Sequence, residues 1–260
     1  ENAYVRLDGH AINYHIPLPE QPNGSCNFVA FTDKASLEFK TTRPIKMVYT
    51  LDGSEPTPAS TAYTAPIEIS ETTTLKIASV LPSGKMSPIR TIQVEKQSLA
   101  PAKEVAQTTP GLNMEVTDGM YLNVKELEAA KKETKKSVIK DLKEIRSVVE
   151  TSESMRGVNQ YAAVATGYVN IPEDGVYFIS SDLEEVWIDG KLLVNNGGEV
   201  KRFSRHDNSV ALAKGLHEIK AVFLGHIIGG WPSNWNDGSI KLRKSDAAEF
   251  TAITPEMLCH

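Results

Sequence analysis

The sequence predicts an all-β protein built from two β-sandwich domains, and three observations lead to that prediction. Short segments with alternating apolar and polar residues recur along the 260 residues, which is typical of strands with one buried face. Asp-Gly pairs join several of these segments, as tight hairpins require. A segment without alternation, Lys96 to Pro110, separates two β-rich parts. We therefore expect a first domain at 1–95, a linker at 96–109 and a larger domain at 110–260.

The first part of the chain contains the alternating segments of a small sandwich. Their number and spacing are typical of an immunoglobulin-like or fibronectin-like sandwich without helices. Between two of them, Gly53 and Pro56 favour a turn, and we expect Asp52 and Ser54 to cap it through hydrogen bonds to the backbone. The predicted strands are Asn27–Thr32, Ser36–Thr41, Lys46–Leu51, Ile67–Ile69, Thr73–Val80 and Ile89–Glu95.

In the larger part, the stretch from Ala165 to Val194 carries the strongest strand signal. Its alternating runs are joined by turns at Asp174-Gly175 and Asp189-Gly190. Glycine at the end of such a pair supplies the positive φ that a tight hairpin needs. We therefore expect an antiparallel meander here.

Composition and charge exclude some classes of partner. With 40% hydrophobic and 23% charged residues, the chain is typical of globular proteins, and no apolar run approaches the length of a membrane span. The net charge of -5 lacks the basic excess that nucleic-acid binding requires. Cys26 and Cys259 have no companion at metal-binding spacing. Two unpaired thiols suit them better than a disulfide between the domains, which stays the alternative.

The larger part also resembles a known family. The segments GYVNIPEDGVYFISSD, at 167–182, and WIDGKLLV, at 187–194, are similar to the protective-antigen (PA14) domain, a β-sandwich found in glycosidases, fungal adhesins and toxins. Segments at 110–121, 210–224 and 250–258 resemble that family's opening strands, a later strand pair and its closing strand. The resemblance implies that 110–260 forms a protective-antigen-type sandwich.

The smaller part resembles a second family. YTLDGSEPTPASTAY, at 49–63, is similar to the C-terminal sandwich of chitobiases and β-N-acetylhexosaminidases, and INYHIPLPE, at 12–20, to the tail after their catalytic barrel. In these family-twenty glycoside hydrolases an adjacent Asp-Glu pair does the chemistry, but this chain contains no Asp-Glu dipeptide. It is also too short for a barrel of about 250 residues beside two sandwiches. The resemblance implies an active site outside this segment, in a periplasmic or extracellular enzyme.

The segment from Asn123 to Val149 admits two predictions. Its apolar residues have the spacing of a helix, but only alanines cover two of the turns that this helix would have. The family resemblance implies instead a short helix near Val124 to Ala129 and an extended stretch around Ser137 to Ile145. We favour that version.

The loop from Ser180 to Glu185 is a candidate binding loop. In protective-antigen domains that bind sugar through calcium, two consecutive aspartates of this loop ligate the ion. Asp182 matches the second aspartate, but Ser181 and Leu183 replace the first aspartate and the glycine. We therefore expect no cofactor, with calcium as the disfavoured alternative.

Sugar recognition without calcium requires exposed aromatic faces beside polar side chains. Trp231 and Trp235 lie in a loop rich in Gly, Pro and Asn, although a structural plug is an alternative role for them. Trp187 lies in a strand, where half-buried packing is the alternative. The expected carbohydrate-binding residues are Trp231, Trp235, Asn236, Asp237, Asp182, Glu184 and Trp187, and no catalytic or metal-binding residue is expected.

These observations favour a non-catalytic accessory region of a β-N-acetylhexosaminidase. Its expected partners are glycans that contain GlcNAc or GalNAc and an upstream catalytic barrel of the same protein, with no nucleic acid and no membrane insertion. The alternative is a structural or protein-interaction role, in which both sandwiches pack on the barrel without binding sugar. A free-standing hydrolase is disfavoured because no paired acid and base can be named.

Overall fold

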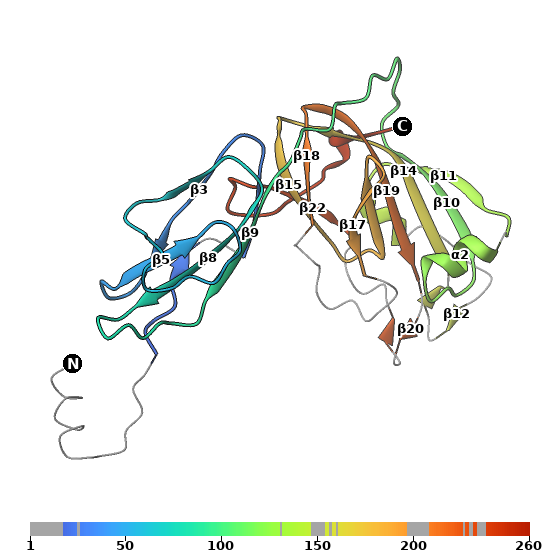
Figure 1. Cartoon of the computed structure of the whole chain (residues 1–260). Coiled ribbons are helices and arrows are strands. Elements are labelled where there is room, and N and C mark those ends of the chain that lie inside the picture. The colour runs from blue at the N-terminus through green and yellow to red at the C-terminus, as the bar shows by residue number, and fades with distance from the viewer. Residues whose placement is uncertain are drawn as a thin grey trace. The chain divides into compact units, whose positions relative to one another are not determined.

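The chain folds into two compact units, Glu1–Lys96 and Gln97–His260 (Figure 1). A computed structural model describes residues 18–24, 27–130, 132–146, 154–155, 158–159, 161–196, 208–225, 227–228, 231–232 and 238–260. Strands dominate both units, which confirms the all-β prediction. No helix of these ranges is long and apolar enough to cross a bilayer. Cys26 lies outside them.

The smaller unit contains a five-stranded sheet with the order β2-β9-β8-β5-β6 and two ribbons, β1-β4 and β3-β7. The β2-β9 pair is parallel, and the other pairs of this sheet are antiparallel. Each predicted strand segment overlaps at least one observed strand. The strands are β1 (Asn23–Gly24), β2 (Phe28–Phe31), β3 (Ala35–Leu37), β4 (Phe39–Lys40), β5 (Lys46–Thr50), β6 (Thr61–Ala62), β7 (Ile67–Ile69), β8 (Thr73–Val80) and β9 (Arg90–Lys96).

The core of the smaller unit lies between its sheet and the β3-β7 ribbon. Leu75 and Ile92 of the sheet pack in one cluster with Leu37 and Ile67 of the ribbon, so the unit has two layers. The Asp52 turn forms as predicted: the amide and hydroxyl groups of Ser54 donate to Asp52 Oδ1 at 3.0 and 2.6 Å. These hydrogen bonds hold the pKa of the Asp52 carboxyl below its usual value.

The larger unit is a sandwich of a seven-stranded and a four-stranded sheet. The first has the order β11-β10-β14-β19-β16-β17, with β24 paired to β14, and the second has the order β18-β15-β22-β23. Two further ribbons are β12-β13 and β20-β21. The strands are β10 (Leu112–Asp118), β11 (Lys135–Ile139), β12 (Ser154–Met155), β13 (Val158–Asn159), β14 (Tyr161–Ile171), β15 (Gly175–Ser181), β16 (Glu185–Ile188), β17 (Lys191–Asn195), β18 (Ser209–Leu212), β19 (Gly215–Leu224), β20 (Ile227–Ile228), β21 (Trp231–Pro232), β22 (Ile240–Lys244), β23 (Thr251–Ala252) and β24 (Leu258–Cys259).

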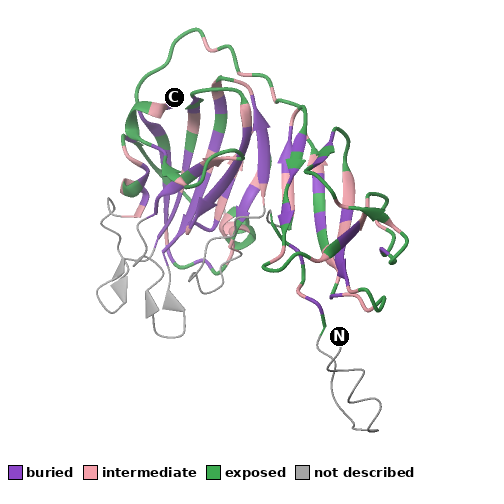
Figure 2. Ribbon diagram, turned by 90° about the vertical axis from the view of Figure 1, so that its left-hand side faces the viewer, coloured by how far each residue is buried: buried purple, intermediate pink, exposed green. Residues whose placement is uncertain are grey.

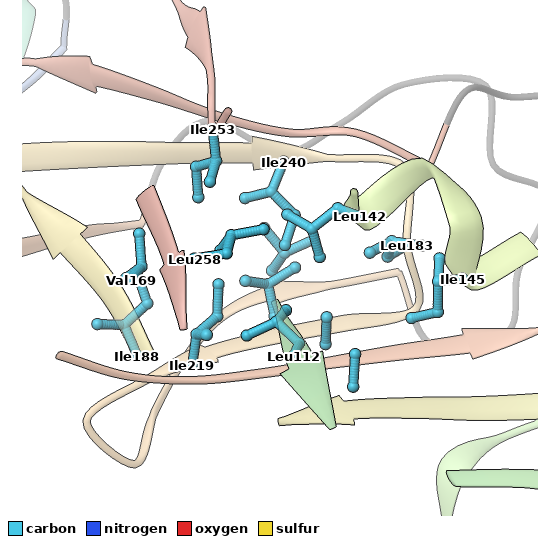
Figure 3. Close-up of a cluster of buried hydrophobic side chains, with 14 of the residues drawn as sticks. Leu112, Leu142, Ile145, Val169, Leu183, Ile188, Ile219, Ile240, Ile253 and Leu258 are labelled. Atoms are coloured by element: carbon cyan, nitrogen blue, oxygen red, sulfur yellow. The ribbon is translucent and has the colours of Figure 1, made fainter. Parts of the chain in front are cut away.

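The main core of the larger unit fills the space between its sheets. In β14, Ala163, Ala165 and Val169 belong to the core, while Thr166 and Tyr168 lie on the outer face. Figure 2 shows buried and more exposed positions alternating along strands of the sheets. Figure 3 shows side chains of both sheets, with those of the connecting segments, gathered in this core. The predicted alternation of inward and outward side chains therefore gives the sheet two different faces. The inner face is buried in the core, and the outer face is available for binding.

The meander prediction was wrong in two respects. β14 and β15 belong to different sheets, and β16 returns to the sheet of β14, so the β16-β17 pair is the single hairpin of this stretch. Asp189 and Gly190 have positive φ values of 47° and 76°, as that hairpin requires, but Gly175 is not among the positive-φ residues of the described chain. Both faces of β15 are buried, so its apolar pattern did not specify its partner strand.

The ambiguous segment begins with helix α2 (Val124–Ala130), followed by β11 and a 3₁₀ helix, η1 (Leu142–Arg146). The short helix is confirmed, whereas the expected extension to Ile145 is wrong beyond Ile139. Glu144 accepts hydrogen bonds from the amides of Lys140 and Asp141 at 3.1 and 2.8 Å, which starts the 3₁₀ turn. Leu142 and Ile145, three residues apart, then both enter the core.

The segment expected to be a linker lies hydrogen-bonded along the larger unit. The amide of Ala100 donates to Ala211 and its carbonyl accepts from Ala213, at 2.8 and 3.0 Å. The amide of Lys103 donates to Leu216 at 2.8 Å, and Thr109 exchanges two backbone hydrogen bonds with His260. Residues after Lys96 are thus held as part of the larger unit.

Candidate functional site

The outer face of the seven-stranded sheet is covered over only part of its length. Helix α2 packs Val124 and Leu127 on this face, where they join a cluster that includes Ala162, Val222 and Leu224. Asn123 Oδ1 and the carboxylate of Glu126 cap the helix reciprocally, which fixes its start. Further along the same strands, the outward residues include Thr166 of β14, Lys220 of β19 and Trp187 of β16.

Trp187 lies in this uncovered part of the face, on β16. Its side chain is half-buried, and the indole Nε1 donates a hydrogen bond to Glu185 Oε2 at 2.8 Å. The ammonium group of Lys220 lies 5.7 Å from the centroid of the indole ring. The ring borders a groove with a volume of about 610 Å³. Trp187 is therefore both oriented by a neighbour and accessible to a ligand.

The loop after β15 uses its residues for packing. The Ser181 hydroxyl donates to the Ser239 carbonyl at 2.8 Å and accepts from the Leu183 amide at 3.2 Å. The side chain of Leu183 is 1% exposed and belongs to the main core. The side-chain amide of Asn196 donates to the carbonyls of Ser181 and Leu183. Ser181 and Leu183, which replace the first aspartate and the glycine of a calcium-binding loop, are thus both part of the interior.

Glu184 is also an interior residue, with 0% of its surface exposed. Its Oε2 accepts a hydrogen bond of 2.7 Å from the Leu224 amide, and its backbone amide donates to Val222 at 3.0 Å. The carboxylate therefore accepts a hydrogen bond from the backbone at the end of β19 and does not face solvent. Asp182, two residues earlier, is half-buried.

The other predicted sugar-binding residues belong to the later loop. Trp231 lies in β21, where its backbone pairs with Ile228 of β20. Trp235, Asn236 and Asp237 lie outside the described residues. Of the predicted residues whose side chains are described, the structure places Trp187 at the groove, Asp182 in the loop and Glu184 in the interior.

His217 forms a buried polar contact that the sequence did not indicate. Its ring is buried in strand β19, where Nδ1 lies 2.6 Å from Asp189 Oδ2 and Nε2 lies 2.8 Å from the Ala213 carbonyl. Asp189 Oδ1 also accepts from the Glu218 amide at 3.0 Å. Among the described residues, no three His, Cys, Asp or Glu side chains gather as a metal site would require. His217 thus braces the β16-β17 turn beside the groove.

Comparisons with known proteins match the two units separately. The model of the chitobiase/β-hexosaminidase C-terminal domain matches residues 29–91, and that of the PA14 domain matches residues 119–253. A β-hexosaminidase of Porphyromonas gingivalis (strain ATCC BAA-308 / W83) is 48% identical over 258 residues, which are 99% of this chain and 33% of that protein. The chain therefore spans about one third of the length of this relative.

Solved structures give more distant similarities. The PA14 domain of the MpAFP antifreeze protein has a TM-score of 0.44 at 13% identity, covering 60% of this chain and 94% of that one. An anti-sigma factor domain-containing protein has a TM-score of 0.41 at 12% identity, covering 88% and 77%. The family-model match over residues 119–253, together with the match at 29–91, assigns both units. The chain belongs to the PA14 family, and a chitobiase/β-hexosaminidase C-terminal domain precedes its PA14 domain.

Proposed function

We propose that this chain is a non-catalytic accessory region of a β-N-acetylhexosaminidase and that it binds glycans containing N-acetylhexosamine. The observation that supports this proposal is the 48% identity to a protein named β-hexosaminidase, of which the chain spans about a third. The remaining length of such a protein leaves room for a catalytic barrel of about 250 residues. A periplasmic or extracellular location, where glycans are accessible, is part of the proposal.

The residues of the chain agree with an accessory role. Hydrolysis by a retaining family-twenty enzyme needs an adjacent Asp-Glu pair, and the sequence contains none. Binding, in contrast, needs an aromatic surface with polar neighbours, and Trp187 with Glu185 and Lys220 supplies one. We propose that this binding needs no calcium, because Ser181 and Leu183 are used in packing.

A structural role is the second candidate, and the interior position of Glu184 favours it. A loop whose carboxylate caps the neighbouring strand stabilises the sandwich and offers that group to no ligand. In this alternative, the two units pack on the catalytic part and bind no sugar.

Kinetics of the whole enzyme separate these candidates. The full-length enzyme is compared with a form truncated before this chain, on a small chromogenic N-acetylhexosaminide and on a long glycan. Accessory binding predicts an unchanged kcat and KM on the small substrate and a KM about tenfold higher on the long glycan after truncation. An equal KM for the long glycan in both forms would refute the binding role.

Thermal unfolding of the catalytic part provides the control. A structural role predicts that truncation lowers the unfolding midpoint and reduces activity on both substrates alike. Loss restricted to the long glycan, at an unchanged midpoint, supports accessory binding.

A further inference from the structure

Four outward residues form a continuous row across the uncovered part of the seven-stranded sheet. Asn113 of β10 pairs with Thr166 of β14, Thr166 pairs with Lys220 of β19, and Lys220 pairs with Trp187 of β16. Directly paired residues point to the same face of a sheet. The row crosses three intervals between strands, which gives it a length of roughly 14 Å. It is therefore longer than one pyranose ring.

The row forms the floor of the groove that Trp187 borders. At about 610 Å³, this groove is within the range of small-molecule binding sites, roughly 300–1,000 Å³. Glu128 of helix α2 and Gly190 of the β16-β17 turn also line it. Elements that are fixed by their own hydrogen bonds thus border the space, which makes it a preformed groove rather than a flat sheet surface.

Trp187 gives one end of the row an oriented apolar surface. The Nε1 hydrogen bond to Glu185 occupies the indole's one polar atom, so the ring is held without needing a ligand. The Lys220 ammonium group lies 5.7 Å from the ring centroid, within cation–π range, and such a contact is weak where solvent reaches it. The long lysine side chain can therefore move aside and donate a hydrogen bond to a sugar that stacks on the indole.

The rest of the groove offers donors and acceptors together. Tyr168 and Glu218 form a second paired position beside the row, and both line the groove. The Glu218 carboxylate is exposed, and its contact with Lys103 is long, at 3.7 Å. Carboxylate, amide, hydroxyl and ammonium groups side by side match the hydroxyl and acetamido groups of a neutral sugar. A purely anionic ligand is disfavoured because Glu218 and Glu128 both line the groove.

We propose that this groove binds an N-acetylhexosamine oligosaccharide of at least two units, laid across the strands with one ring stacked on Trp187. The length follows from the row, whereas the identity of the sugar rests on the proposed function. The described residues that line the groove belong to β10, β14, β16, β19, helix α2, the β16-β17 turn and His260. The groove adds a binding surface on the sheet itself.

Calorimetric titration of the 260-residue chain tests the proposal, with GlcNAc, its β-1,4-linked disaccharide and the trisaccharide as probes. We expect the disaccharide to bind at least about tenfold more tightly than the monosaccharide, and Trp187→Ala to weaken disaccharide binding about tenfold. Trp187→Phe, which retains an aromatic face, should weaken it less. Equal affinity for monosaccharide and disaccharide would overturn the proposed length.

A variant that fills the groove tests the proposal without removing any contact that a ligand would make with Trp187. Thr166 is exposed in the middle of the row, so Thr166→Trp should fill the groove and abolish binding while the strand tolerates the new ring. Thr91→Trp, at an exposed position of β9 in the smaller unit, is the matched control and should bind normally. Circular dichroism and the unfolding midpoint verify that each variant is folded.

The same titrations separate this inference from the proposed function. Full binding by both Trp187→Ala and Thr166→Trp, with loss in Trp231→Ala, would refute the groove and leave accessory binding intact. Absence of binding by the unsubstituted chain would refute the groove as well, while the kinetics of the truncated enzyme would still decide the accessory role.

Discussion

At the scale of single residues, His217 shows how a buried polar group is accommodated in this fold. The imidazole Nε2 lies 2.8 Å from the Ala213 carbonyl oxygen, and Nδ1 lies 2.6 Å from Asp189 Oδ2, so both ring nitrogens have a polar partner. The ring is 0% exposed, and the Asp189 side chain is 14% exposed. The pair therefore links strand β19 to the hairpin turn through a short contact in the interior.

Replacing His217 by Leu should destabilise the larger unit by about 3 kcal/mol, the cost of leaving a buried charged group without its partner. The substitution leaves the largely buried Asp189 carboxylate without its hydrogen-bond partner on His217, which costs more than the loss of an exposed contact. Urea unfolding of the two single variants, His217→Leu and Asp189→Asn, and of the double variant measures the coupling free energy. Asn tolerates the positive φ at 189, so it is a suitable partner variant. A loss below about 1 kcal/mol in His217→Leu would contradict the interpretation.

The role of an individual residue was predictable from the sequence where its interaction partners lie close to it in the chain. Asp52 and Ser54 form their predicted turn because both partners lie within three residues of sequence. Glu184 was expected to bind carbohydrate, yet its carboxylate is buried and accepts a hydrogen bond from the Leu224 amide, forty residues away. The backbone amide at the end of β19 requires a hydrogen-bond acceptor only because the sheet has folded. No local sequence pattern therefore indicates that Glu184 supplies this acceptor.

At the scale of elements, capping determines what the segment after β10 becomes. The reciprocal contacts of Asn123 and Glu126 start α2, and those of Glu144 with the amides before it start η1. The short helix was predictable through the family resemblance. The 3₁₀ helix was not, because it depends on placing Leu142 and Ile145 together in a core formed by distant strands.

The loop between β15 and β16 should be indifferent to calcium. Millimolar Ca²⁺ or excess chelator is expected to leave the thermal midpoint of the chain unchanged, because Leu183 fills the core and the Asn196 amide occupies two loop carbonyls. Ser181→Asp alone should not create a site, since it restores one carboxylate but leaves Leu183 in place. A calcium-dependent rise of the midpoint in the unsubstituted chain would refute this expectation.

At the scale of the whole molecule, the two-sandwich organisation was predictable and the sheet membership of neighbouring strands was not. Alternation in β14 and β16 indicates which side chains are buried, but it does not distinguish a hairpin from a connection that crosses between sheets. The row of outward residues across β10, β14, β19 and β16 combines residues from 113 to 220. It could not be recognised before the strand order was known, although Trp187 alone was a candidate.

Residues 97–109 should contribute to the stability of the larger unit. Five backbone hydrogen bonds join Ala100, Lys103 and Thr109 to the larger unit. A chain of residues 97–260 should therefore be more stable than one of residues 110–260, because the shorter chain leaves backbone groups of Ala211, Ala213 and Leu216 without these partners. Urea unfolding monitored by circular dichroism measures the difference.

A pair of substitutions at one position tests the same point without truncation. Lys103→Pro removes the amide that donates to Leu216, whereas Lys103→Ala keeps it and removes only an exposed side chain with a 3.7 Å contact to Glu218. The proline variant should be less stable than the alanine variant by about 1–3 kcal/mol, because the Leu216 carbonyl loses its donor and the ring restricts the preceding residue. Equal stability of the two variants, together with equal stability of the truncated chains, would mean that 97–109 is a linker after all. The stability of the larger unit would then come from its sheets alone.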